Sequence, residues 1–287
     1  MDIGLTADMT KHEAAPARDR LWARYRDKDF ADRLSSVPWN EALDIIMSHR
    51  SVRSYRDEPL PPGTLELLIA AASSAATTSN LQAWSVIAVE DPARKPRLAS
   101  FAASQRHIVH APLLLIFVAD LARRRSISTE RGHAGIALNY VEAFIFAIAD
   151  ASFAAQNAIV AAESIGLGGC YIGAMRNHPA AVADELALPD ETLVVFGMTI
   201  GIPDPSVQTD VKPRLPQNVI LHRERYSPPD SALLAAYDQR IRDFQAEQKM
   251  RVTDWTEQSA LRVRDEAALT GREVLRDFLR DRGFSLR

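Results

Sequence analysis

The longest apolar stretch of the chain, residues 136–165, constrains the fold more than any other feature. Its apolar side chains recur at helical spacing around most of the circumference, and they include Val141, Phe144, Ile145, Ile148, Phe153, Ala154, Ile159 and Val160. A helix that is apolar nearly all round lies in the core of a large domain or in a subunit interface. Polar residues interrupt this pattern too often for a bilayer span, namely Glu142, Asp150, Gln156, Asn157 and Glu163. We therefore expect a core helix that also contributes to a dimer interface, and no membrane segment.

The composition is that of an ordinary globular protein. The 287 residues are 47% hydrophobic and 25% charged, which suffices for one large domain or two modest ones. The formal net charge of -3 gives no field that would attract nucleic acid or an anionic membrane. The single cysteine, Cys170, excludes a disulfide within the monomer, and the seven histidines lack HxxxH or HExxH spacing, so no metal site is expected. The N-terminus has no apolar signal segment, so we expect a cytoplasmic location.

Three short apolar runs indicate strands at 84–90, 113–119 and 193–200. The second run is continuously apolar, so both of its faces are expected to be buried. The glycine-rich segment 166–174 allows close approach by something flat or by another chain. It has no GxGxxG after a strand, and the chain has no GxxxxGK[ST], so neither Rossmann nor P-loop nucleotide binding is indicated. Cys170 lies in this segment without a flanking base, which favours a small buried residue over a nucleophile.

The remaining segments carry charge without an assigned role. Residues 1–39 form an appendage with a short helix and no recognisable chemistry. The arginine run at 123–125 is expected in a polar loop that reaches about residue 131, either solvated or facing a phosphate. From residue 231 the pattern predicts charged helices at 233–248, 256–269 and 272–282, which could form arms around a partner subunit.

Donor groups gather at Ser48 to Tyr55, with the sequence SHRSVRSY, where a helix is expected to give way to a strand. A short amphipathic helix precedes it, and alternation then places Ser51, Arg53 and Tyr55 on one side of an extended segment. Two arginines, an imidazole and several hydroxyls at one place suit phosphate or planar carbonyl groups. The alternative is a helix end whose cations satisfy the last carbonyls, and the octet alone favours that alternative.

Two further segments have donor chemistry of the same kind. Thr77, Thr78 and Ser79 lie between a helix and a strand, where hydroxyls either line a ligand or form a turn. Pro213 keeps its neighbours extended, so Lys212 and Arg214 should project to the same side, ~6.5–7 Å apart. A rigid pair of cations suits a phosphate, although a solvated basic loop is an equal alternative.

Five blocks, in order and in spacing, resemble the nitroreductase family, and within it the NADPH-preferring, oxygen-insensitive group that includes nitroreductase A and flavin reductase P. The blocks are residues 49–55 (HRSVRSY), 105–107 (QRH), 156–169 (QNAIVAAESIGLGG), 171–177 (YIGAMRN) and 212–216 (KPRLP). The resemblance implies a homodimeric α+β fold with a mostly antiparallel central sheet flanked by helices, a long core and dimer helix, and a helical C-terminal extension. By this likeness the chain divides into an N-terminal extension at 1–39, an FMN-binding core at 40–228 and a helical extension at 229–287.

The resemblance also implies one FMN in each of two clefts at the subunit interface. Arg50 would hold the phosphate together with Lys212 and Arg214. Arg53 would face the pyrimidine edge of the ring, and the amide of Gly173 would point at flavin N5. The full set of implied FMN contacts is His49, Arg50, Ser51, Val52, Arg53, Thr77, Thr78, Ser79, Gln105, Tyr171, Ile172, Gly173, Ala174, Lys212 and Arg214.

The chain departs from the family pattern at several of these places. Thr77, Thr78 and Asn80 occupy a loop that is commonly all serine, and Ala174 replaces a usual glycine. Arg251 matches a cation for the NADPH 2′-phosphate, but a second tail arginine does not align. NADPH is therefore the expected co-substrate, with NADH as an alternative.

The activity implied by the resemblance is FMN-dependent NAD(P)H oxidation, with ping-pong hydride transfer through flavin N5 to nitroaromatics, quinones or free flavin. It requires no catalytic side-chain nucleophile or base, and Arg53 and Gly173 would tune the flavin. Two alternatives are a flavin reductase that supplies reduced FMN to a partner oxygenase, and a non-catalytic FMN-binding or sensing protein. The expected partners are small-molecule oxidants and a second copy of the chain.

Overall fold

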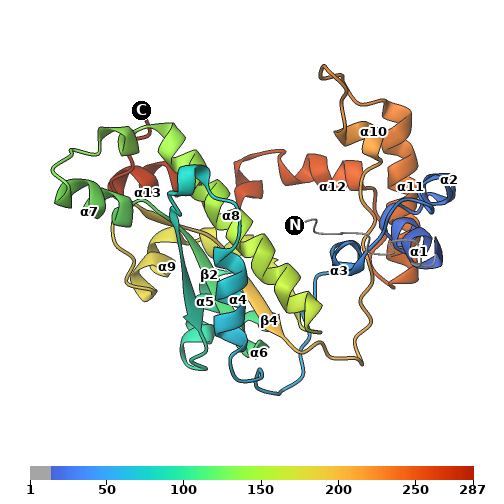
Figure 1. Cartoon of the computed structure of the whole chain (residues 1–287), viewed down its shortest axis with the longest axis horizontal. Helices are drawn as coiled ribbons and strands as arrows, with labels where there is room; N and C mark the ends of the chain where they lie inside the picture. The colour runs from blue at the N-terminus through green and yellow to red at the C-terminus, as the bar shows by residue number, and fades with distance from the viewer. Residues whose placement is uncertain (1–13) are drawn as a thin grey trace, which may run out of the picture. The chain divides into compact units, whose positions relative to one another are not determined.

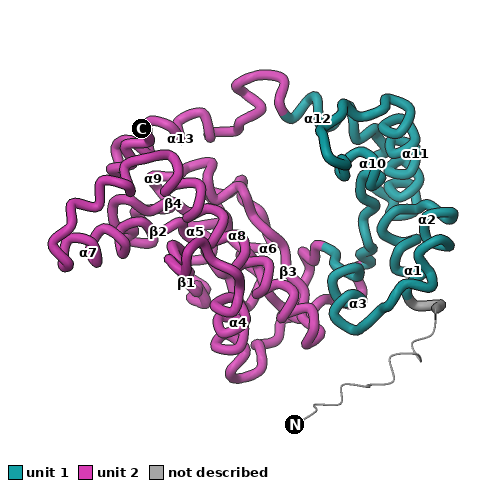
Figure 2. Tube along the Cα trace, turned by 45° about the horizontal axis from the view of Figure 1, so that its top comes forward, with its two compact units in different colours: residues 1–50, 208–262 teal, residues 51–207, 263–287 magenta. Residues whose placement is uncertain are grey.

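The computed structural model describes residues 14–287, which fall into two compact units. The first unit combines the described residues up to 50 with residues 208–262, and the second combines residues 51–207 with residues 263–287 (Figure 2). Each unit therefore joins segments that are far apart in the sequence. The sequence suggests an N-terminal extension that ends at residue 39 and a core that ends at residue 228. This division stays a prediction.

The second unit is built on a four-stranded antiparallel sheet with the strand order β1-β2-β4-β3. Figure 1 labels the two inner strands, β2 and β4. The strands are β1 (Trp84–Val89), β2 (Leu113–Asp120), β3 (Gly168–Ile172) and β4 (Thr192–Gly201). The expected α+β fold with an antiparallel sheet is confirmed, as are the three expected strands. Strand β3 was expected only as a glycine-rich segment, because glycine is depleted in strands and gives no apolar alternation.

Strand β2 lies in the middle of the sheet and every one of its residues is buried. Its side chains alternate between two core clusters. Leu113, Leu115 and Phe117 pack with helices α4 (Thr64–Ser73) and α8 (Val141–Ser164). The intervening residues Leu114, Ile116 and Val118 pack with α5 (Arg94–Phe101), α6 (Arg106–His110) and α9 (Pro179–Glu185). Helices therefore cover both faces of the sheet, which explains why the strand is apolar without alternation.

Helix α8 is the expected core helix, and a short 3₁₀ turn, Ile136–Asn139, precedes it. In the described part of the chain it is the one helix long and apolar enough to cross a membrane by length and composition. Nine of its residues are buried against the sheet and its neighbours, as expected for the core helix of a globular fold. It also leaves Val141, Ile145 and Phe153 exposed, so its contribution to a dimer stays a prediction.

The arginine run at 123–125 lies in helix α7 (Ala122–Glu130), so the expectation of a polar loop is wrong. The side chains of Arg123 and Arg125 are fixed by specific acceptors and do not simply face solvent. Arg125 Nε donates to the Glu191 carboxylate at 3.0 Å, and its Nη1 donates to Gly135 O at 2.8 Å. Arg123 Nη2 donates to Trp84 O at 2.7 Å. Trp84 and Glu191 are distant in sequence, so local charge alone could not reveal the helix.

The first unit is helical throughout its regular structure. Its helices are α1 (Ala14–Tyr25), α2 (Lys28–Arg33), α3 (Glu41–Ser48), α10 (Gln217–Ile220), α11 (Ser231–Glu247) and α12 (Trp255–Arg262). Asn40 caps α3, because its Oδ1 accepts a hydrogen bond from Leu43 N at 3.0 Å. Helix α11 buries Tyr237, Ile241 and Phe244 along one face, as its helical spacing predicts.

The C-terminal tail is less continuous than its pattern suggests. The helix expected over 256–269 ends at Arg262. Asp265 then starts a separate 3₁₀ turn, Glu266–Leu269, by accepting a hydrogen bond from Ala268 N at 3.0 Å. A second 3₁₀ turn, Arg272–Val274, leads into α13 (Leu275–Asp281). An aspartate that caps a new turn interrupts the longer helix.

Phe117 is the residue on which we test the core. Its side chain is fully buried, and its ring centroid lies 5.8 Å from that of Phe196 and 6.3 Å from that of Trp84. We expect Phe117→Ala to lower the free energy of unfolding by about 3–5 kcal/mol, because it opens a cavity in the core. Chemical denaturation measures the change. The control Val263→Ala, at an 80% exposed position, should change it by less than about 0.5 kcal/mol. A loss below about 1 kcal/mol for Phe117→Ala would contradict this description of the core.

Candidate functional site

The first unit contains the cations that the sequence assigns to a phosphate. Val211 and Pro213 are buried while Lys212 and Arg214 are exposed, so the two cations project from the same side of an extended segment, as predicted. Arg50 is also exposed, and its Nε donates to Thr209 Oγ1 at 3.1 Å, immediately before that segment. Exposed guanidinium and ammonium groups can bind a phosphate together when their side chains converge on it.

The backbone beside these cations is held by Arg24, a residue of α1 whose role was not predicted from the sequence. Its Nη2 donates to Met47 O at 3.0 Å and to His49 O at 2.8 Å, and its Nη1 donates to Lys212 O at 3.0 Å. The alternative interpretation of the octet expected its own arginines to satisfy the last carbonyls of the helix. Arg24 performs that task from another helix.

The second unit contains the rest of the octet. Ser51 forms a parallel bridge with Gly169, and Val52 N donates to Gly169 O at 2.9 Å, so the extended segment lies beside β3. Tyr55 locks the segment, because its hydroxyl donates to Val52 O at 2.6 Å and lies 2.8 Å from Thr199 Oγ1. The side chain of Val52 is buried, so a ligand would meet this residue through its backbone.

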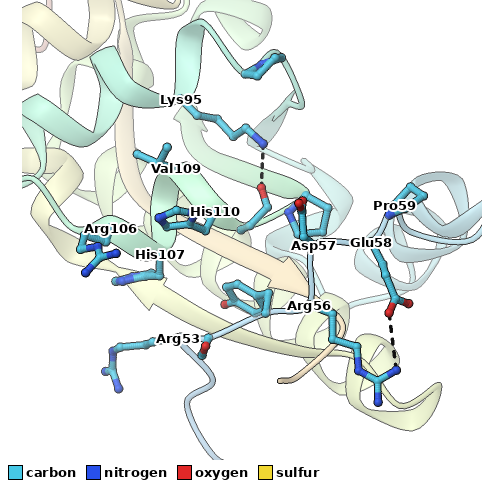
Figure 3. Close-up of a pocket in the computed structure, with 15 residues that line it drawn as sticks. Arg53, Arg56, Asp57, Glu58, Pro59, Lys95, Arg106, His107, Val109 and His110 are labelled. Atoms are coloured by element: carbon cyan, nitrogen blue, oxygen red, sulfur yellow. Dashed lines mark hydrogen bonds and ion pairs between the residues drawn. The ribbon is translucent and has the colours of Figure 1, made fainter. Parts of the chain in front are cut away.

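A cavity of about 870 Å³ lies within the second unit, beside the extended segment (Figure 3). Figure 3 shows Arg53, Arg106 and His107 together on one side of it. Burial and then the charge of Arg53 lower the pKa of His107, so the neutral imidazole is favoured. Its buried Nε2 has no hydrogen-bond partner among residues 14–287. The same end of the cavity therefore offers two guanidinium groups and a neutral ring.

Gln105 and Cys170 also belong to the second unit. Gln105 precedes α6, and its side-chain amide donates to Ala102 O at 3.0 Å. Burial raises the pKa of the Cys170 thiol, which fits a buried residue and not a nucleophile.

The threonine-rich loop is tied to the core by Asp150, a carboxylate of α8 that is 1% exposed. Its Oδ1 accepts from Thr78 N at 2.9 Å, and its Oδ2 accepts from Thr77 Oγ1 at 2.7 Å and from Ala83 N at 3.0 Å. The hydroxyl of Thr77 also accepts from Gln82 N at 2.9 Å. Ser79 lies in the left-handed region with φ of 47°. The hydrogen bonds to Asp150 thus explain how this loop keeps its shape. In the sequence, Asp150 is visible only as a polar residue that interrupts an apolar helix.

The glycines after α8 differ in how much space surrounds them. At Gly169 an added Cβ would lie 2.6 Å from Thr199 O and from Ile159 Cδ1, so the packing of the chain itself requires a glycine. At Gly173 an added Cβ would meet only Arg176 Nη2, at 3.6 Å. The chain's own packing therefore does not demand glycine at 173, where the backbone is open to a flat ligand.

The neighbours of Gly173 show which surface such a ligand would meet. Ile172 is 1% exposed, and Tyr171 packs edge-on against Phe196 with a centroid distance of 5.0 Å. Burial raises the pKa of Tyr171, so its phenol stays protonated at neutral pH. Ala174 packs partly buried against the core on the other face of the sheet. This segment would thus contact a ligand mainly through its backbone.

The predicted residues are divided between the units. His49, Arg50, Lys212, Arg214 and the exposed Arg251 belong to the first unit, and all the others belong to the second. No group of three or more metal-binding side chains is arranged to hold an ion among residues 14–287.

Comparison with known proteins gives two matches to sequence models of one family. The model described as "Nitroreductase family" matches residues 46–202, and the model described as "Nitroreductase family, C-terminal domain" matches residues 212–287. The NADPH-dependent FMN reductase of Bacillus subtilis is 33% identical over 252 residues, which are 86% of this chain and 99% of that protein. The oxygen-insensitive NADPH nitroreductase of Salmonella typhimurium is 36% identical over 202 residues, which are 70% of this chain and 81% of that protein.

The fold has solved counterparts. The structure of B. megaterium NfrA2 aligns with a TM-score of 0.82 at 31% identity, covering 87% of this chain and 100% of that one. Residues 14–45 lie outside both family matches, although helix α1 holds the backbone of the candidate phosphate segment.

His107 provides a test of the electrostatics in the second unit. We expect its pKa to lie below the ordinary value of about 6.5 in an NMR titration of the folded protein. Arg53→Gln should raise it without restoring the ordinary value, because burial is the larger cause. Arg106→Gln serves as the matched control and should leave it nearly unchanged. Because the folded state favours the neutral ring, His107 should cost stability as the pH falls below about 6.5. A pKa at or above 6.5 would contradict this assignment.

Proposed function

Because the chain belongs to the nitroreductase family, we propose that it is an FMN-dependent oxidoreductase that takes hydride from NADPH, or from NADH, and passes it to nitroaromatics, quinones or free flavin. The observation that carries the proposal is the cation set of the first unit. Lys212 and Arg214 project from one side of a segment that lies against Arg50, through Thr209. A phosphate monoester is the ligand that such a set suits best.

The roles of the individual residues follow from their chemistry. Arg50, Lys212 and Arg214 would bind the flavin phosphate, with His49 beside them. In the second unit, Arg53 would stabilise negative charge at the pyrimidine edge of the ring. When bound, the flavin supplies the hydride chemistry, so no side-chain nucleophile is needed.

The ring-binding set in the second unit combines backbone and side-chain contacts. The open backbone at Gly173 would lie against the ring, which is supported by the space around this glycine. The remaining proposed contacts are Ser51, Val52, Thr77, Thr78, Ser79, Gln105, Tyr171, Ile172 and Ala174. The Asp150 contacts suggest that Thr77 and Thr78 act by shaping the loop as much as by touching a ligand.

We also propose a homodimer. Its support is the apolar surface that α8 leaves exposed, where Ile145 is 55% and Phe153 is 49% exposed. The other proposed partners are small-molecule oxidants, and we propose a cytoplasmic location. The net charge of -3 offers no reason to add nucleic acid.

A second candidate function is a flavin reductase that releases reduced FMN to an oxygenase. It is supported by the names of the relatives, which include an FMN reductase as well as a nitroreductase. Steady-state turnover of a nitroaromatic compound compared with that of free FMN separates the two functions.

The deciding experiment is anaerobic stopped-flow mixing of the protein, after incubation with FMN, with NADPH. Loss of the flavin absorbance within one turnover time is the expected result. A flavin that binds but is not bleached would indicate a binding or sensing protein, and a colourless protein that does not take up FMN would overturn the proposal.

The phosphate assignment predicts a selective loss of affinity. We expect Lys212→Ala and Arg50→Ala each to weaken FMN binding about tenfold or more, because each removes a charged hydrogen-bond donor. Binding of riboflavin, which lacks the phosphate, should change little. Quenching of flavin fluorescence measures both affinities. The control Lys249→Ala removes another exposed cation of the same unit and should affect neither. Equal losses for FMN and riboflavin would contradict a phosphate site here.

Arg251 is the candidate for the 2′-phosphate that distinguishes NADPH from NADH. Its exposed guanidinium lies between α11 and α12 in the first unit. We expect Arg251→Ala to raise the KM for NADPH about fivefold to tenfold and to leave the KM for NADH nearly unchanged, because only NADPH carries the extra phosphate. Steady-state kinetics with both nucleotides measures the difference. Arg262→Ala, in the following helix, is the matched control. If both KM values shift together, Arg251 does not read the 2′-phosphate.

A further inference from the structure

Arg24 is an almost fully buried cation that comes from outside the family-matched sequence. It lies near the end of α1, and 6% of its surface is exposed. The family matches begin at residue 46 and resume at residue 212, so α1 belongs to neither. A buried guanidinium needs acceptors for its donors, and those acceptors show what the residue organises.

Three of its acceptors belong to the two segments that carry the candidate phosphate cations. Met47 O and His49 O directly precede Arg50, and Lys212 O belongs to one of the cations itself. The backbone of Arg24 takes part as well, because its carbonyl accepts a hydrogen bond from Arg214 N at 2.8 Å. One residue thus joins two stretches of backbone that are separated by about 160 positions in the sequence.

The geometry requires the planar fork of arginine. A guanidinium presents five donors in fixed directions, so it can bind carbonyls of two segments at once, whereas a lysine ammonium is a compact charge on a flexible stem. The side chains at 50, 212 and 214 start from the backbone that Arg24 fixes. Binding groups displaced by about 1 Å lose much of their effect.

Helix α1 has other attachments, so the role of Arg24 can be separated from simple anchoring of the helix. Arg20 pairs with the carboxylate of Asp44 in α3, at 2.8 and 3.0 Å. Arg240 of α11 donates to Asp27 Oδ2 at 2.9 Å, just beyond the end of α1. These contacts do not involve the carbonyls beside the cations.

We propose that Arg24 is a positioning residue for the flavin phosphate, supplied by the N-terminal segment. It holds the carbonyls of Met47, His49 and Lys212 so that Arg50, Lys212 and Arg214 converge on one phosphate. The inference rests on the proposed function, because it needs a phosphate bound by these cations. It gives residues 14–39 a role in cofactor binding, although they lie outside the family matches.

The test is the ratio of FMN affinity to riboflavin affinity in the full-length protein. Arg24→Ala should weaken FMN binding at least tenfold, about 1.4 kcal/mol, and leave riboflavin binding within about twofold. Arg24→Lys keeps the charge but not the fork, and it should also weaken FMN binding several-fold. The matched control Arg20→Ala removes another link between α1 and α3 and should keep the ratio of the wild type. Riboflavin binding also shows that each variant has folded.

The outcomes separate this inference from the proposed function. If Lys212→Ala lowers the ratio but Arg24→Ala and Arg24→Lys do not, the phosphate site stands and the role of Arg24 is overturned. Equal loss of FMN and riboflavin binding in Arg24→Ala also overturns it, since the residue would then serve only stability. If the wild type binds riboflavin as tightly as FMN, the proposed phosphate site fails, and the inference fails with it.

Discussion

The close packing of α8 on the central strand is the constraint from which the rest of the second unit follows. Seven of the nine buried residues of α8 are alanines. Small side chains on the helix leave room for Leu113, Leu115 and Phe117 on the facing side of β2. One carboxylate, Asp150, is placed within this alanine surface, where it can be buried only because three donors satisfy it. The packing that forms the core therefore also fixes the loop at 77–79.

The sequence predicted those elements whose signals are local. The continuous apolar run of β2 and the all-round apolar pattern of α8 each report burial on every side, so both were predicted. Strand β3 was not predicted, because its glycines are required by close packing against residues that are distant in sequence. An added Cβ would clash with Val52 at Gly168 and with Thr199 O at Gly169. Helix α7 was not predicted, because the acceptors of its arginines include residues far away in the sequence, such as Glu191 for Arg125 and Trp84 for Arg123.

In the candidate site, too, some features are determined by neighbouring residues and others by residues that are distant in sequence. Pro213 makes its segment extended wherever it lies, so the common direction of Lys212 and Arg214 could be predicted from three residues. The role of Arg24 could not, because nothing near it in the sequence marks which carbonyls it will meet. The role of Arg24 can be recognised only in the folded chain, where α1, the end of α3 and the segment at 212 lie next to one another.

An N-terminal segment that lies outside the family matches can have a structural role at the candidate site. The carbonyls at the end of a helix need donors, and they will accept them from water, from a cap or from another part of the chain. Water gives such a helix end no fixed direction, whereas a buried guanidinium couples it to a second segment. In this chain the coupled segment carries the other two cations of the set, Lys212 and Arg214. Because ligand binding is sensitive to how well its groups are preorganised, adding one buried arginine at this junction can change cofactor affinity without changing any residue that touches the cofactor.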